Sequence, residues 1–415
     1  MSGQPDRINS APDPGADPGP SVACQASLVT VLREWGRIGC TGFGGPPAHI
    51  ALLRKLCVDR QQWMDAREFE DAIAACNLLP GPASTQLAIF CAWRVRGRPG
   101  ALAGGAAFII PGLVIILALS VLFLAGTPPL WVRGAGMGAG AAVAAVAVQA
   151  GWSLIPPSWK RAAGPRRWRW TGYLLAGAAA ADTIGPWLVL VLLGCGVTEL
   201  VVKRARDGTP RQEAAAGKVP GIAVLPVLAK VGGTVAGGAG LAGVAWVAFK
   251  VGALSFGGGF VIIPLMRADA VGRGWMTGGQ FLNAVALGQI TPGPVVHTVS
   301  AVGYAAAGVA GGLLAALVAF SPSFVFVLGG ARYFSALRTS RAAQAFLDGA
   351  GPAAIGAIFG SAILLAGELR QPWQFAVLAA AAALLLGLRR GVVVTLLAAA
   401  ATGLVVALAG GPLPH

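Results

Sequence analysis

Charged residues are scarce in this sequence. Asp, Glu, Lys and Arg make up 11% of its 415 residues, whereas hydrophobic residues make up 56% and the mean hydropathy is +0.71. A soluble domain of this size cannot bury so much apolar surface, so most of the chain must face lipid. Apolar runs at 101–124, 134–152 and 345–367 are long enough to cross a bilayer, and too long and continuous for the alternating strands of a β-barrel. We therefore predict an all-α polytopic membrane protein.

Residues that commonly carry catalysis or bind metals are also few. The chain has three histidines, and its six cysteines show no CxxC spacing. The cysteines are therefore expected to be small packing residues, not a disulfide framework or a zinc site. The sequence has no Ser-His-Asp order, HExxH, Walker loop, or GxGxxG after a strand. We expect no enzymatic activity, no ATP-driven pumping by this chain alone, and no cofactor or metal.

Positive charge outweighs negative charge, with a formal net charge of +15. The basic residues lie in short loops between apolar runs, as the positive-inside rule requires, and not in a stripe interleaved with aromatics. Nucleic acid is therefore not an expected partner, whereas the lipid bilayer is. Residues 1–26, in which Pro, Asp, Gly and Ser are frequent, lack the apolar core of a signal peptide and are expected to form a disordered tail.

Two stretches about 213 residues apart repeat one pattern. The first contains Phe43-Gly44-Gly45 and Pro80-Gly81-Pro82, and the second contains Phe256-Gly257-Gly258 and Pro292-Gly293-Pro294. Matched Gly, Arg, Trp and Phe residues accompany both, and the offset shortens by one residue midway, as expected for a duplication with a single-residue gap. Duplicated halves with broken, glycine-rich segments are typical of secondary transporters.

Loop charges predict that the two halves are inverted. In the first half the basic loops at 94–98 and 160–169 fall on one side, which should be the cytoplasm. The loop at 305–308, which matches 94–98, has no charge. The turn at 332–341 has three arginines, whereas its first-half counterpart at 126–133 is nearly neutral. This antiphase pattern predicts an inverted-topology repeat of about 10 to 13 transmembrane or re-entrant helices.

The same reading divides the chain into units. We assign a first repeat to 27–202, a basic cytoplasmic loop and linker to 203–240, and a second, inverted repeat to 241–415. Four plain spans follow the motif region in each half. The motif regions themselves are interrupted by charges, by Gly-Gly and by Pro-Gly-Pro, so broken helices or re-entrant hairpins are expected there.

The paired glycine motifs are candidate anion sites. Consecutive glycines in Gly42-Phe43-Gly44-Gly45 and Ser255-Phe256-Gly257-Gly258 can adopt positive φ and approach a ligand closely. A helix that follows such a loop offers free N–H groups and a positive dipole end. Close helix packing is the alternative role for the glycines. Their occurrence twice, inside broken segments, favours the anion site.

The Pro-Gly-Pro motifs cannot continue a helix, because two of three N–H donors are missing and each ring crowds the preceding turn. New helices are expected near Ser84-Thr85-Gln86 in the first half and near His297 in the second. Carbonyls before each break and N–H groups after it then need protein, water or substrate as partners. A mechanical hinge without ligand contact is the alternative.

Cations inside the apolar regions are costly, so they are candidate site residues. Arg37 and Lys250 occupy matched positions, as do Arg54 and Arg267. Paired cations beside two glycine-rich helix starts suit a tetrahedral dianion, because an arginine can bind two oxygens at once. Snorkelling to the interface is the alternative, above all for the second pair.

Four residues are candidate proton carriers: Glu34, His49, Asp71 and His297. Glu34 could equally be a structural counter-ion of a neighbouring arginine, and His49 a satisfied buried histidine. The full set of substrate-binding candidates is Arg37, Gly42, Phe43, Gly44, Gly45, His49, Pro80, Gly81, Pro82, Ser84, Thr85, Gln86, Lys250, Ser255, Phe256, Gly257, Gly258, Thr291, Pro292, Gly293, Pro294 and His297.

These motifs resemble the chromate ion transporter family in its long, two-domain form. The resemblance covers nearly the whole chain from about residue 27 and rests on 44–50, 77–87, 256–260 and 291–294. It implies a bacterial inner-membrane protein that exports chromate, driven by the proton gradient, and confers chromate resistance. Gly259 stands where many relatives have alanine, which leaves the backbone argument unchanged.

The leading hypothesis is a secondary active transporter that moves an oxyanion, chromate first, by rocking the inverted halves around a site near the midplane. Sulfate has the same shape and charge as chromate and is the alternative cargo. A membrane scaffold or sensor is a hypothesis of another class, but a scaffold would not need broken helices in both halves. The sequence leaves open whether the working unit is a monomer or a homodimer, and whether protons move with or against the anion.

Overall fold

The computed structural model describes residues 26–79, 81–124, 128–162, 166–183, 187–207, 240–255, 262–330 and 340–413. Within these residues all the regular structure is helical, which confirms the prediction of an all-α membrane fold. Four helical segments of this part of the chain are long and apolar enough to cross a membrane: Ala83–Phe123, Leu130–Arg161, Val295–Gly330 and Arg341–Gly367.

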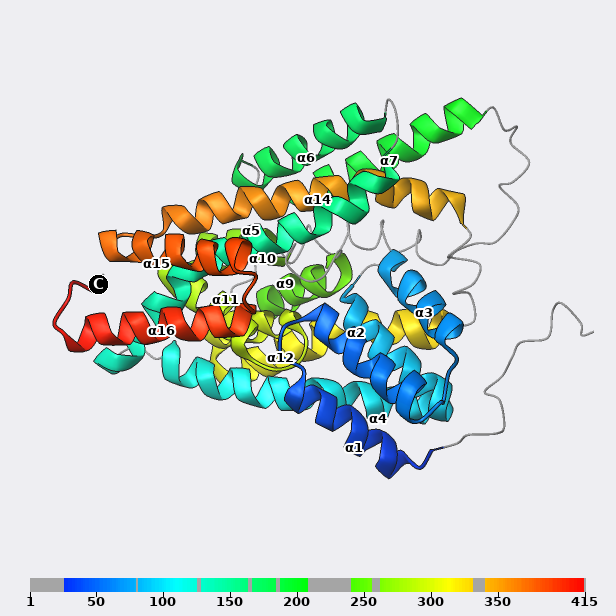
Figure 1. Cartoon of the computed structure of the whole chain (residues 1–415), viewed down its shortest axis with the longest axis horizontal. Coiled ribbons are helices and arrows are strands. Elements are labelled where there is room, and N and C mark those ends of the chain that lie inside the picture. The colour runs from blue at the N-terminus through cyan, green and yellow to red at the C-terminus, as the bar shows by residue number, and fades with distance from the viewer. Residues whose placement is uncertain are drawn as a thin grey trace, which may run out of the picture.

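The first half of the chain forms the helices coloured from blue to green in Figure 1. They are α1 (Leu28–Thr41), α2 (Pro46–Arg54) with a π-helical extension (Lys55–Arg60), α3 (Ala66–Leu78), α4 (Ala83–Phe123), α5 (Leu130–Arg161), α6 (Arg166–Thr183) and α7 (Leu188–Asp207).

The second half continues from green to red. It comprises α9 (Leu241–Leu254), α10 (Ile262–Gly272), α11 (Gly278–Ile290), a 3₁₀ turn (Val295–His297) leading into α12 (Thr298–Gly330), α14 (Arg341–Gly367), α15 (Pro372–Ala382) with a π-helical end (Ala383–Gly387), and α16 (Val392–Leu408).

Local sequence explains where several helices begin. The Ser27 side chain accepts the N–H of Thr30 at the start of α1, and the Asp65 side chain accepts that of Glu68 at the start of α3. Thr277 forms a capping box with the glutamine three residues on, at the start of α11. Each cap satisfies an N–H donor that has no partner inside its own helix.

Two of the longest helical segments are broken at matched positions. In α4, Arg96 and Gly97 have φ of −144° and 62°; in α12, Ala307 and Gly308 have φ of −152° and 64°. A glycine is required at the second position of each pair, because φ is positive there. The two breaks lie about 211 residues apart and share almost the same backbone conformation, so both halves turn in the same way.

Each break folds its segment back on itself as a helical hairpin. Gly100 packs against the Ala92 carbonyl, and Gly311 against the Gly303 carbonyl. Residues eight apart in a straight helix would lie about 12 Å from each other. The first limb of α4, residues 83–95, spans about 20 Å and is too short to cross a bilayer. These hairpins confirm the broken helices predicted beside the Pro-Gly-Pro motifs.

The two halves of the chain are interleaved. In Figure 1, α14 of the second half lies along α6 and α7 of the first, and α5 packs against α14, α15 and α16. Small residues allow the close approach: Gly356 of α14 meets the Leu174 carbonyl of α6, and Gly138 of α5 meets the Ala399 carbonyl of α16. This glycine-rich packing is typical of helices in membranes.

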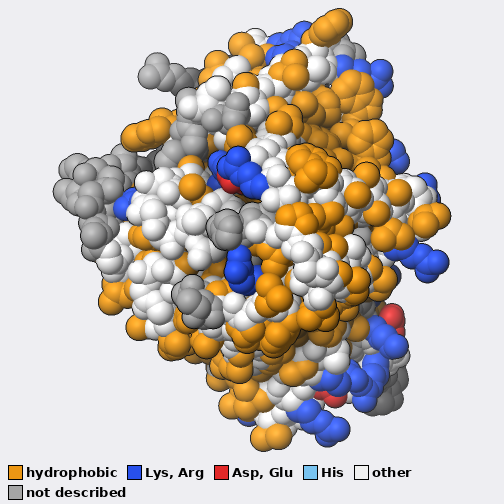
Figure 2. Space-filling view, turned by 90° about the vertical axis from the view of Figure 1, so that its left-hand side faces the viewer, with side chains coloured by type: hydrophobic (Ala, Val, Ile, Leu, Met, Phe, Trp, Pro, Cys, Tyr) orange, Lys and Arg blue, Asp and Glu red, His pale blue; other side chains and the backbone are white. Residues whose placement is uncertain are grey.

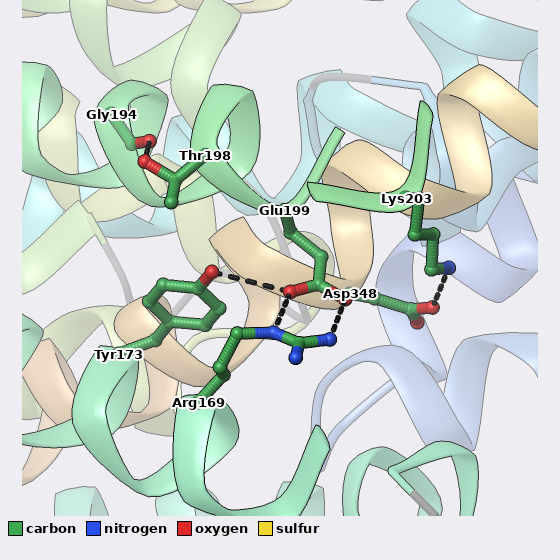
Figure 3. A network of polar contacts seen from close by, with 7 residues as sticks. All are labelled: Arg169, Tyr173, Gly194, Thr198, Glu199, Lys203 and Asp348. Carbon is green, nitrogen blue, oxygen red and sulfur yellow. Dashed lines mark hydrogen bonds and ion pairs between the residues drawn. The ribbon is translucent and has the colours of Figure 1, made fainter. Parts of the chain in front are cut away.

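A polar network joins the halves at one end of this interface (Figure 3). Arg169 of α6 donates from Nε to Glu199 of α7 at 2.8 Å, and the Tyr173 hydroxyl donates to the same carboxylate at 3.2 Å. One turn further along α7, Lys203 Nζ lies 2.7 Å from Asp348 of α14. The Glu199 side chain is buried, so its two donors compensate for the loss of water.

The outer surface suits a lipid environment. Leu317, Ile363 and Leu408 are each more than two-thirds exposed although they are large and apolar. In Figure 2, hydrophobic side chains cover much of the visible face, and Lys and Arg gather near its centre and along its right and lower edges. Large apolar side chains with this exposure would be unfavourable in water, so they support a multi-pass membrane protein.

Several predictions fall outside the described residues. They concern most of the N-terminal tail, the linker at 208–239, Pro80, and the second glycine loop at 256–261. The domain limits and the inverted orientation of the second half stay predictions.

Candidate functional site

The first glycine loop separates α1 from α2, as the sequence predicts. Gly44 and Gly45 have φ of +99° and +73°, a conformation that favours glycine. His49 of α2 turns back to this loop: its Nε2 lies 2.9 Å from the Gly42 carbonyl and its Nδ1 lies 3.3 Å from the Ser84 hydroxyl. The buried His49 therefore connects the glycine loop to the first turn of α4.

The second Pro-Gly-Pro motif reaches across to this loop. The N–H of Gly293 donates to the Gly42 carbonyl at 3.0 Å, and Gly293 has φ of +91°. A Cβ built on Gly45 would lie 3.6 Å from Val295, which follows the motif. Residues about 250 positions apart thus share one hydrogen bond at the centre of the molecule. The second Pro-Gly-Pro motif and the first glycine loop are therefore in direct contact.

The reciprocal contact joins the first Pro-Gly-Pro motif to the second half. Gly81 has φ of +118°, and a Cβ built on it would lie 3.2 Å from the Gly252 carbonyl of α9 and 3.5 Å from the Ser323 hydroxyl of α12. Gly252 is the repeat counterpart of Gly39. Each Pro-Gly-Pro break therefore lies against the glycine-rich helix end of the opposite half.

The long limbs of α4 and α12 complete this arrangement with a matched proline kink. Pro111 and Gly112 in α4 correspond to Pro322 and Ser323 in α12. Gly112 packs against the carbonyl of Pro292, and a Cβ on it would also lie 2.7 Å from His297 Cε1. Because Ser323 approaches the other Pro-Gly-Pro, each long limb supports the break of the opposite half.

A set of buried polar atoms around these breaks has no hydrogen-bond partner among the described residues. Buried polar atoms of native proteins are nearly always paired, so such a set indicates a functional region. Hydroxyl and amide groups can donate to the oxygens of a tetrahedral anion. The atoms are Thr85 Oγ1, Ser255 Oγ, Ser300 Oγ, Ser323 Oγ and Gln289 Nε2.

The two kinds of helix start differ in the N–H groups that they offer. Pro46 and Pro47 open α2 and have no N–H, so the first glycine loop offers fewer donors than its motif suggests. At the start of α4, Thr85 and Gln86 donate to the Pro82 carbonyl at 2.9 and 3.0 Å. The N–H groups just before them remain as the orphan donors of a helix N-terminus. The start of α4 therefore offers more free N–H donors than the start of α2.

The two matched cations lie in different surroundings. Arg37 is 53% exposed, and its guanidinium lies 2.7 Å from Glu34, which also lies 3.7 Å from Arg60. Lys250 is 6% exposed and forms an ion pair with Asp269 of α10. The structure thus buries Lys250 near the centre and does not bring Arg37 to the breaks.

Other predicted residues are peripheral. The Phe43 side chain is 45% exposed and does not fill the core. Asp71 is half-buried on α3. The matched arginines also face carboxylates: Arg54 lies 3.2 Å from Glu70, and Arg267 pairs with Glu368. Pro80, Phe256, Gly257 and Gly258 lie outside the described residues.

Most of the candidates that the structure brings together are buried, and Gly44 and Gly45 of the glycine loop are the exceptions. Around the crossed breaks it places Gly42, Gly44, Gly45, His49, Gly81, Pro82, Ser84, Thr85, Gln86, Ser255, Thr291, Pro292, Gly293, Pro294 and His297.

Sequence reasoning missed three residues of this region. Asp269 stands as a single acid in an apolar stretch, which was an available signal. Gly112 and Ser323 follow a proline inside long apolar runs, at matched positions, and that match was visible as well. Their contacts with the opposite half depend on packing, which no local pattern reports.

Comparison with known proteins gives the family. The family model described as "Chromate transporter" matches residues 29–200 and again 242–404, which is most of the chain in two copies. The chain belongs to the chromate transporter family. The two matched segments coincide with the two halves that carry the crossed Pro-Gly-Pro motifs.

Individual relatives in the family are similar over most of their length. A chromate transport protein of Cupriavidus metallidurans is 33% identical over 359 residues, covering 86% of each chain. One of Pseudomonas aeruginosa is 31% identical over 350 residues, covering 82% of this chain and 81% of its own. A probable chromate transport protein of Synechococcus elongatus is 29% identical over 340 residues, covering 82% of this chain and 84% of its own. No solved structure matches this family member.

Proposed function

We propose that this chain is a secondary active transporter that exports chromate across the bacterial inner membrane, coupled to the proton gradient, and thereby gives chromate resistance. The observation that carries the proposal is the hydrogen bond from the Gly293 N–H to the Gly42 carbonyl, which joins a break of one half to the glycine loop of the other. Broken helices that meet between repeats are where secondary transporters bind their substrates.

Chromate is the proposed cargo because the relatives are named as chromate transport proteins. Its charge and shape suit the site. The orphan N–H groups at the start of α4 lie beside Thr85 and Ser84, and Lys250 supplies a buried positive charge. Lys250 is a better candidate than Arg37, which is exposed and bound to Glu34.

The transport test uses everted membrane vesicles that contain this protein. Everted vesicles that are energised with a respiratory substrate should accumulate labelled chromate, and a proton ionophore should abolish the accumulation. Vesicles from cells without the protein are the control. If energised vesicles accumulate neither chromate nor sulfate above that control, the transport proposal is wrong.

Sulfate is tested in the same assay as a competitor. It has the same charge and tetrahedral shape as chromate, so hydrogen-bond donors alone discriminate poorly between them. We expect sulfate to compete more weakly than unlabelled chromate. Stronger competition by sulfate would make sulfate the proposed cargo instead.

A further inference from the structure

A cluster of three charged side chains, two of them buried, joins α9 to α10 and to the turn that follows α10. Lys250 and Asp269 form an ion pair, and each side chain is 6% exposed. Arg273 Nε lies 3.3 Å from the other oxygen of the same carboxylate, and Arg273 also lies over the Trp275 ring. One carboxylate therefore binds two cations in the interior of a membrane protein, where each charge carries a large desolvation cost.

The repeat itself does not need this carboxylate. With the 213-residue offset, the first-half counterpart of Asp269 is Leu56, a buried apolar residue. The counterparts of Lys250 and Arg273 are Arg37 and Arg60, which lie near the buried carboxylate of Glu34, on a different helix position, but are each 53% exposed. Only in the second half is the cation itself buried, because Lys250 is 6% exposed.

The cluster is close to the crossed breaks. Lys250 precedes Gly252 by two residues, and the Gly252 carbonyl lies beside Gly81 of the first Pro-Gly-Pro. Ser255, whose buried hydroxyl has no partner among the described residues, ends the same helix. Along the axis of α9, Lys250 therefore lies within one turn of the first break, with its side chain on the α10 side and Gly252 on the α12 side.

We propose that the Asp269 carboxylate forms ion pairs with Lys250 and Arg273 in the anion-free protein. The transported dianion then displaces the carboxylate from these two cations. The inference rests on the proposed function and adds a positioning residue to it. Once displaced, the Asp269 carboxylate is buried without a counter-charge, so it takes one proton from water and becomes a carboxylic acid. No other covalent bond changes. One proton then accompanies each dianion.

Few other ionisable groups face this cluster. Of the helices packed against α9 and α10, α11 has none and α12 has only Tyr304. On α14, Asp348 binds Lys203 of α7, and Arg341 is exposed. Glu368, just after α14, binds Arg267. Asp269 is therefore the carboxylate whose protonation should follow anion binding.

The coupling permits export through the membrane potential. A dianion that carries one proton crosses with a net charge of −1, so the inside-negative potential favours its exit, whereas a pH gradient that is acidic outside opposes the outward-moving proton. The coupling is also thermodynamically reciprocal, so protons must strengthen anion binding if the anion promotes protonation.

The test measures sulfate and chromate binding to purified protein by calorimetry, and proton uptake on sulfate addition in weak buffer. Sulfate is the probe for protons because it stays a dianion near neutral pH, whereas chromate itself takes up protons. Wild type should take up about one proton per bound sulfate. The Asp269→Asn protein should take up no proton when sulfate binds. It should bind both anions about tenfold tighter, because no carboxylate competes with the anion for Lys250.

Two variants control for altered folding. Tyr304→Phe removes the one ionisable side chain of the neighbouring helix α12, leaves the Lys250–Asp269 pair in place and should keep the proton uptake of wild type. Adding Lys250→Gln to Asp269→Asn should reverse the gain in affinity. If Asp269 only stabilised the fold, its replacement would weaken anion binding. A gain in anion affinity therefore distinguishes the proposed role from a structural one.

Three results would overturn the inference. Sulfate binding by wild type without proton uptake would contradict it, and this measurement does not depend on any variant folding. A folded Asp269→Asn protein with unchanged or weaker affinity would contradict the displacement alone. If neither wild type nor Asp269→Asn binds chromate or sulfate, the proposed function fails together with the inference.

Discussion

At the scale of single residues, function is concentrated in buried polar groups that the fold leaves without partners. Thr85 and Ser323 have buried hydroxyls without hydrogen-bond partners among the described residues, and both lie beside the first Pro-Gly-Pro break. Ser120, by contrast, lies on the same helix as Thr85 and donates to the Ile116 carbonyl at 2.7 Å. Only the first two have hydrogen-bonding capacity left for a ligand.

This difference predicts that two conservative substitutions affect chromate transport differently. Thr85→Val should weaken chromate transport, raising the half-saturating concentration about tenfold, while protein stability stays level or rises, because a partnerless buried hydroxyl is lost. Ser120→Ala should leave the half-saturating concentration unchanged. Vesicle uptake over a range of chromate concentrations and thermal unfolding of the purified proteins measure both effects. Equal uptake by Thr85→Val and wild type would remove Thr85 from the site.

At the scale of helices, the packing between the halves depends on glycines at particular positions. Gly356 and Gly351 both lie on α14, but a Cβ would collide with the Leu174 carbonyl at Gly356 and would meet open space at Gly351. Overpacking a tight contact costs about 1–3 kcal/mol, whereas alanine in place of glycine gains about 1 kcal/mol in helix propensity. Alanine should therefore destabilise the protein at Gly356, where it collides, and stabilise it slightly at Gly351, where only helix propensity changes.

Gly356→Ala is therefore expected to lower the unfolding temperature and the yield of folded protein, whereas Gly351→Ala should match or exceed wild type. Thermal unfolding in detergent, followed by loss of the monodisperse peak in gel filtration, measures the difference. Two variants of equal stability would show that α6 and α14 do not pack as closely as the structure indicates.

Much of this element-scale structure follows from local sequence chemistry. Pro-Gly-Pro cannot continue a helix, and new helices do begin at Ala83 and Val295. The Arg37 and Lys250 pair shows where local reasoning stops. Their matched positions in the repeat suggested matched roles. The exposure of each side chain, however, depends on how the neighbouring helices pack: Arg37 is exposed, whereas Lys250 is buried and pairs with Asp269 on another helix. Contacts between the halves therefore could not be predicted from the sequence.

At the scale of the whole molecule, the account depends on two halves of opposite orientation. Support comes from the two hairpin tips, which share one backbone conformation but differ in charge. The tip in α4 has Arg94, Arg96 and Arg98 around it, whereas the tip at Ala307 and Gly308 has no charged neighbour. The positive-inside rule therefore predicts that the first tip is cytoplasmic and that the second is not.

Arg98 and Val309 are matched, exposed positions at these tips, and they allow the orientation to be measured. Arg98→Cys and Val309→Cys are introduced singly into a protein in which Cys24 of the N-terminal tail and the exposed Cys40 are replaced by serine. A membrane-impermeant thiol reagent added to intact cells or spheroplasts should label the second variant only, and in everted vesicles it should label the first. Labelling of both variants from one side would contradict the inverted repeat.

The central claim is that the oxyanion binds where the breaks of the two halves cross. Its most direct measurement is an anomalous difference map from crystals of the protein grown with chromate, in which chromium marks the anion. The account predicts a chromium peak between the start of α4 and the second Pro-Gly-Pro, within hydrogen-bond reach of Thr85 or Ser323. A well-occupied peak only among the basic loops, with none between the crossed breaks, would contradict it.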